Sequence, residues 1–91
     1  MSGNSQHIND LIQLLADTSD PNALRALLED LCTAKELENM AERCYAAKLL
    51  MEGKTYNQVM ELVEISSATL SRVSRCVQYG NGYSNILKTD K

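Results

Sequence analysis

Apolar residues recur every three or four positions along most of the chain, which is the spacing of amphipathic helices. The first two stripes are rich in leucine and isoleucine (Ile8, Leu11, Ile12 and Leu15; then Leu24, Leu27, Leu28 and Leu31). We expect the first helix to follow a frayed start over residues 1–5 and to end near Asp17. Asp20 should cap the second helix, with Pro21 in its first turn, where a missing amide costs nothing. No segment alternates apolar and polar residues, so the predicted fold class is all-α.

The longest predicted helix runs from Ala34 to Glu52. Thr33 and Glu36 have the spacing of a capping box, in which each side chain bonds the other residue's free amide. Gly53 should end the helix in a left-handed conformation. The side chains expected to point inward are those at helical spacing: Leu37, Met40, Ala41, Cys44, Ala47 and Met51.

Two short helices joined by a tight corner are predicted within residues 55–78, with Thr55 and Ser66 as their caps. Their inner faces are apolar (Val59, Leu62 and Val63; then Leu70, Val73 and Val77). Each is too short to be stable alone, so they must pack on each other and on the rest of the chain. The outer face of the second helix is small, hydroxylated and basic: Ala68, Ser71, Arg72 and Arg75. Such a face suits the DNA major groove, so the stretch is predicted to be a helix-turn-helix.

The amino-acid composition adds only a little to the prediction of fold and function. The 91 residues contain no Trp or Phe, so the core of this single small domain must consist of aliphatic side chains and Met. The net charge of −3 argues against a protein that covers nucleic acid without sequence preference. The charge is uneven, with nine acids and four bases in residues 1–52 but three acids and five bases in residues 53–91.

The side chains that carry most catalytic and metal chemistry are sparse. Cys32, Cys44 and Cys76 lack the spacing of a zinc site, and His7 is the one histidine, so we expect buried free thiols and no metal. No nucleophile-and-base set or Gly-rich phosphate loop is present, and we expect no enzyme. Without an apolar membrane-spanning run or a leader, we expect no membrane association and a cytoplasmic location.

Three segments, Leu31–Arg43, Leu49–Gly53 and Ser67–Arg75, together resemble the tryptophan repressor superfamily, in particular its YerC/YecD-like branch. The resemblance covers about Leu11 to Val77. It implies an intertwined homodimer that binds double-stranded DNA as a repressor-like transcriptional regulator. Residues 5–52 would then be the dimerisation helices, 55–78 the helix-turn-helix with helix 66–78 in the major groove, and 79–91 a turn and C-terminal tail.

The resemblance also implies candidate site residues. Those near the DNA would be Asn57, Ser67, Ala68, Thr69, Ser71, Arg72 and Arg75. A ligand pocket would include Thr33, Arg43, Arg72, Val73 and Cys76. Val73 stands where the repressor has glycine and should fill the space of an indole ring, and Cys76 replaces a pocket serine and bonds charged groups poorly. We therefore expect no tryptophan corepressor and no other cofactor.

Two alternatives stay open. Glu64 stands where a corner glycine is usual, and a left-handed backbone there would be strained. The domain could thus be a dimeric protein-interaction module that has lost DNA binding. It could also be a sensor of another small ligand, held around Arg43 and Arg72.

Overall fold

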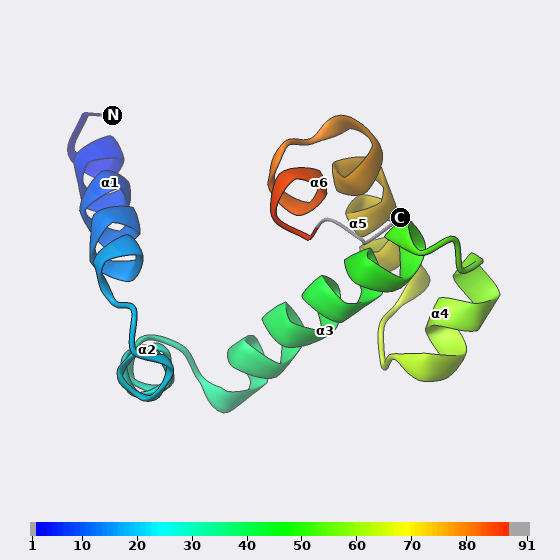
Figure 1. Ribbon diagram of the computed structural model, residues 1–91, viewed down its shortest axis with the longest axis horizontal. Helices are drawn as coiled ribbons and strands as arrows, with labels where there is room; N and C mark the ends of the chain where they lie inside the picture. The colour runs from blue at the N-terminus through cyan, green and yellow to red at the C-terminus, as the bar shows by residue number, and fades with distance from the viewer. Residues whose placement is uncertain (1, 88–91) are drawn as a thin grey trace. The chain divides into compact units, whose positions relative to one another are not determined.

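The computed structural model describes the backbone of residues 2–87 and the side chains of residues 5–87, and this part of the chain contains six helices and no strand (Figure 1). The helices are α1 (Ser2–Asp17), α2 (Pro21–Leu31), α3 (Ala34–Met51), α4 (Tyr56–Leu62), α5 (Ser67–Tyr79) and α6 (Gly82–Ile86). The predicted all-α class is confirmed, and the end of the predicted tail, from residue 88 on, lies outside the described residues. The chain forms two compact units, Met1–Leu37 and Glu38–Lys91, which are described separately.

The N-terminal unit consists of α1, α2 and the start of α3. The α1 helix already begins at Ser2, so the expected frayed start is wrong for residues 2–5. Asp20 caps α2 as predicted, because its Oδ2 accepts from the amide of Ala23 at 3.2 Å. The capping box that opens α3 is also confirmed: the Thr33 amide donates to Glu36 Oε1 at 2.8 Å, and the Glu36 amide donates to Thr33 Oγ1 at 3.0 Å.

This unit has almost no interior of its own. None of residues 5–37 is buried. Large apolar side chains that would form a core in a self-sufficient domain are instead exposed: Ile8, Leu11, Ile12, Leu14 and Leu31. The apolar stripe of α1 is largely exposed and that of α2 is at most half-buried, so neither helix has the burial that normally stabilises such helices.

The buried core of the described residues lies entirely in the C-terminal unit. It joins the C-terminal half of α3 to α4 and α5, which lie beside it in Figure 1. The buried side chains are those of Ala46, Ala47, Leu49, Val59, Val63, Leu70 and Val73. Three predicted inward positions are wrong: Ala41, Cys44 and Leu62 are exposed. The first two precede the part of α3 that contributes to the core, which begins at Ala46. Leu62 is the last residue of α4, where the core instead uses the one-turn pair Val59 and Val63.

Local hydrogen bonds set the ends of α3 and α4. Gly53 has φ +99°, and α3 ends in a Schellman motif, with the amides of Gly53 and Lys54 donating to the carbonyls of Leu50 and Leu49 at 3.0 and 3.1 Å. Thr55 caps α4 by accepting from the amide of Gln58 at 3.2 Å. Gln58 Oε1 in turn accepts from the Thr55 amide at 2.9 Å. The two bonds together form a capping box, of which only the Thr55 half was predicted.

Thr55→Ala is expected to lower the free energy of unfolding by about 1 kcal/mol, because it removes the Oγ1 that accepts from the Gln58 amide. Chemical denaturation followed by circular dichroism would measure the change. Thr55→Ser keeps an Oγ acceptor and should retain most of the stability. Equal losses in both variants would mean that the hydroxyl's hydrogen bond is not what stabilises the turn.

Candidate nucleic-acid interface

The α4–α5 pair forms a helix-turn-helix whose corner is short and unstrained. Val63 closes α4 with its amide donating to the Val59 carbonyl at 2.8 Å, and Ser66 opens α5 by accepting from the Thr69 amide at 3.2 Å. No residue other than glycine has a positive φ in residues 2–87, so the left-handed strain considered for Glu64 is absent. The corner instead uses extended backbone at Val63 and Ser66, which any side chain can adopt.

The outer face of α5 carries most of the predicted DNA-binding residues. Ser67, Ala68, Arg72 and Arg75 are exposed, whereas Leu70 and Val73 face the core. Ser71 and Thr69 are half-buried, and Thr69 Oγ1 accepts from Ser66 Oγ at 3.0 Å. The Thr69 hydroxyl is therefore engaged in the cap. Asn57 lies exposed in the first turn of α4.

The positive charges of this face are not neutralised by nearby carboxylates of the described chain. The one ion pair within residues 5–87 joins Arg25 to Glu29 at 3.1 Å, on α2. Arg72 and Arg75 therefore present uncompensated guanidinium groups. In the first turn of α5, N-terminal to both arginines, the backbone amides lack intrahelical acceptors, which adds partial positive charge at the start of the helix. Small side chains beside two free guanidinium groups make a surface that fits a phosphate-lined groove.

A polar hollow of about 400 Å³ adjoins this face. It is lined by Arg43, Thr69, Arg72, Val73, Cys76 and Tyr83, and so brings together four of the five predicted pocket residues. Thr33 belongs to the N-terminal unit, where it caps α3. Tyr83 is an unpredicted member of the wall, because its place there depends on the turn between α5 and α6.

A smaller polar hollow of about 230 Å³ lies at the corner itself. Its walls include Arg43 together with two carboxylates, Glu42 and Glu64, and the start of α5 (with Asn39, Ile65, Ser66 and Thr69). Glu42 is an unpredicted member of this wall, because a position on α3 shows no relation to the corner until the helices pack. Glu42 and Glu64 therefore line the same hollow as Ser66 and Thr69 at the start of α5.

Cysteine and other ligating side chains form no metal site in the described residues, where no three His, Cys, Asp or Glu side chains come together. All three cysteines are free. The expectation of buried thiols is wrong, because Cys44 is exposed and Cys32 and Cys76 are half-buried. In residues 2–87 no helix combines the length and the apolar character that crossing a membrane requires.

Comparison with known proteins identifies the family to which this chain belongs. The profile of the family described as "Trp repressor protein" matches residues 6–91. The uncharacterized protein YerC of Bacillus subtilis (strain 168) is 34% identical over 76 residues, which are 84% of this chain and 73% of YerC. The crystal structure of a candidate Trp repressor from Staphylococcus aureus superposes with a TM-score of 0.85 at 30% identity, covering 90% of this chain and 83% of the other. The chain therefore belongs to the Trp repressor family, in its YerC-like branch.

Proposed function

We propose that the protein is a cytoplasmic transcriptional regulator that binds specific DNA sequences as a homodimer, with α5 in the major groove and no tryptophan corepressor. The observation that carries this proposal is the outer face of α5. It is exposed and basic and carries mostly small side chains, while the opposite face is buried in the core. Ser67, Ala68 and Ser71 would lie nearest the bases, and Arg72 and Arg75 would bind phosphate or guanine. Serine distinguishes bases weakly, so we expect modest specificity and strong salt dependence.

The dimer is supported by the N-terminal unit. Within residues 5–31 the helices α1 and α2 bury no side chain, so they need a partner surface. A second copy offers the same apolar stripe and forms a closed two-fold assembly, the commonest kind of oligomer. Two copies of α5 would then meet successive major grooves about 34 Å apart.

A selection of duplexes from a randomised pool by the purified protein at near-physiological salt tests the function. The expected outcome is enrichment of an inverted repeat whose half-sites are about one helical turn apart. If no sequence is enriched, with or without tryptophan, specific DNA binding by the protein alone is wrong.

A protein-interaction module is the second candidate, favoured by the outer side of α4. Tyr56 and Met60, one turn apart, expose large apolar side chains there, and Leu62 exposes another on a different side at the end of the helix, beside the acidic Glu61. Such a module would remain dimeric and equally stable when the predicted DNA-binding residues are substituted. It would enrich no duplex in the selection.

Tryptophan at millimolar concentration is expected to leave the melting temperature unchanged. Val73 is buried, with 1% of its surface exposed, and its isopropyl group lines the hollow between Arg43 and Arg72. A ligand that binds the native state raises the melting temperature with its concentration, so differential scanning fluorimetry provides the measurement. D-tryptophan is the matched control. A rise with the L isomer alone would show that Val73 does not block the site.

A further inference from the structure

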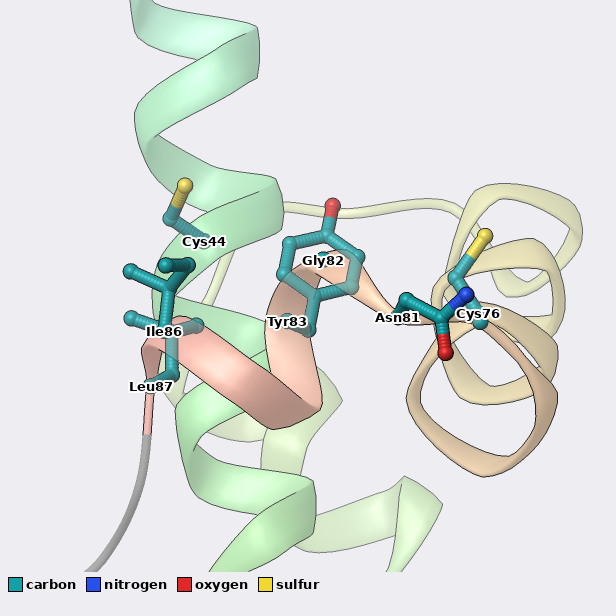
Figure 2. A pocket seen from close by; sticks show the side chains of 8 residues that line it. Cys44, Cys76, Asn81, Gly82, Tyr83, Ile86 and Leu87 are labelled. Carbon is teal, nitrogen blue, oxygen red and sulfur yellow. The ribbon is translucent and has the colours of Figure 1, made fainter.

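The turn between α5 and α6 contains the one Asn-Gly dipeptide of the sequence, Asn81-Gly82. Both residues are exposed, and they line an apolar hollow beside α6, where Figure 2 shows them next to each other. Within the described part of the chain the Asn81 side chain makes no cap hydrogen bond. The Gly82 amide opens α6 and therefore has no intrahelical acceptor. Neither amide is held in place by a hydrogen bond of the helix.

Glycine at position 82 allows these two amides to come together. Beyond its chain neighbours and its own helix backbone, no described atom lies within 4 Å of where a Cβ at Gly82 would stand. Asn81 has φ −114° and ψ −12°. Contact between the Gly82 nitrogen and Asn81 Cγ requires rotation away from this helical ψ. A helix of five residues opposes that rotation only weakly, and glycine lets the backbone follow it.

The other asparagines within residues 5–87 lack this combination. Each lies inside a helix and is followed by a residue with a side chain (Asn9, Asn22, Asn39, Asn57 and Asn85). These five are exposed as Asn81 is, so exposure does not distinguish them. What distinguishes Asn81 is the glycine after it and its position just before a helix. Both features belong to the chain itself and do not depend on the oligomeric state.

We propose that Asn81 is a site of spontaneous deamidation, which converts it to aspartate and isoaspartate with water as the co-reactant. The Gly82 nitrogen loses its proton to solvent and attacks Asn81 Cγ. The new C–N bond closes a succinimide ring, and the side-chain nitrogen leaves as ammonia. Water then opens the ring, at the side-chain carbonyl to give aspartate or at the backbone carbonyl to give isoaspartate. Either product carries one more negative charge than asparagine.

The isoaspartate product changes the turn more than the aspartate product, because its main chain runs through the side-chain methylene. Ser84 Oγ donates to the Gly80 carbonyl at 3.2 Å, a hydrogen bond that spans Asn81. A longer main chain between these two residues should break that bond and loosen α6. Neither product reverts to asparagine, so the share of altered chains increases with the age of the protein. This modification goes beyond the proposed DNA-binding function and does not depend on it.

The test is to incubate the folded, full-length protein at neutral pH and physiological temperature for several weeks. Isoelectric focusing detects the added charge, and peptide mass spectrometry locates it. Protein isoaspartate methyltransferase with radiolabelled S-adenosylmethionine counts the isoaspartate. We expect a steadily growing acidic species that is altered at Asn81, and ¹⁵N NMR of that species should show shifted amides in residues 80–86.

Three variants identify the chemistry. Gly82→Ala should fold normally, because the space around Gly82 accepts a methyl group, and it should lose the acidic species over the same incubation. Asn85→Ala, the matched control within α6, should form the acidic species at the wild-type rate. Asn81→Asp has the charge of the product without the longer main chain, so its amide shifts should be smaller than those of the isoaspartate species.

Several results would overturn the proposal. One is a folded protein that stays unmodified while the same chain in urea gains the acidic species, which would mean that the fold or a second copy protects the turn. Another is equal accumulation in Gly82→Ala. A third is modification at the other asparagines and not at Asn81. Since no DNA is present, each of these results leaves the DNA-binding proposal to be judged by the duplex selection.

Discussion

Arg75→Ala is expected to lower DNA affinity by at least about two orders of magnitude while the protein stays folded and dimeric. Arg75 is exposed and lies three residues after Arg72 on the outer face of α5, with no carboxylate of the described chain paired to it. A hydrogen bond to a charged group contributes about 1.5–3 kcal/mol, and a dimer would lose two of them. Fluorescence anisotropy with the selected duplex measures the affinity.

The salt dependence shows what kind of contact Arg75 makes. If each copy contacts one phosphate, the slope of log affinity against log salt should fall by about 1.8 in the variant dimer. Arg25→Ala is the matched control, because it removes the same charge from the exposed Arg25–Glu29 pair on α2 and should leave the affinity unchanged. A wild-type affinity and slope in Arg75→Ala would rule out α5 as the DNA-binding surface.

Ile12→Asp is expected to dissociate the dimer, raising its dissociation constant by at least about a thousandfold. Ile12 is 58% exposed within the protomer, so the substitution removes little packing from the chain itself. In a dimer that covers the α1 stripe, the carboxylate would be placed among apolar side chains without a partner. Sedimentation velocity at micromolar protein measures the oligomeric state, and circular dichroism should show a loss of helix from the unassembled N-terminal unit.

The control for Ile12→Asp is Gln13→Glu, which adds the same charge on the opposite face of α1. Gln13 is exposed, and its amide donates to Asp17 at 3.0 Å, so this variant should remain dimeric with at most a small loss of helix stability. If both variants are dimers, residues 5–17 do not form the interface. DNA affinity should follow the oligomeric state, since a protomer alone offers one α5.

Helix ends were the part of the fold most accessible from sequence. Helices begin or end where predicted at Asp20, Thr33, Gly53 and Ser66. Each of these residues sets the hydrogen bonds of amides or carbonyls within one turn of itself. The bounds of α5 shifted by one residue, from 66–78 to Ser67–Tyr79, and a short helix, α6, lies within the segment expected to be a turn and tail. Capping geometry is local, so the neighbouring residues contain most of the information.

Burial was less predictable, because it depends on which part of a helix meets another element. Periodicity alone placed Cys44 and Ala47 on one face of α3, yet the core takes Ala47 and leaves Cys44 exposed. The same limit applies to the site. The exposed face of α5 follows from the spacing of Leu70, Val73 and Val77, whereas the contribution of Tyr83 required the fold of the turn before α6.

The unburied N-terminal helices have a consequence for how the regulator would respond to its own abundance. In the proposed dimer, folding of residues 5–37 and association are one equilibrium, so apparent stability depends on protomer concentration. At low concentration the amount of competent dimer rises with the square of the protomer concentration. A twofold change in synthesis would then produce about a fourfold change in the DNA-binding species, which makes switching sharper than a monomeric binder allows.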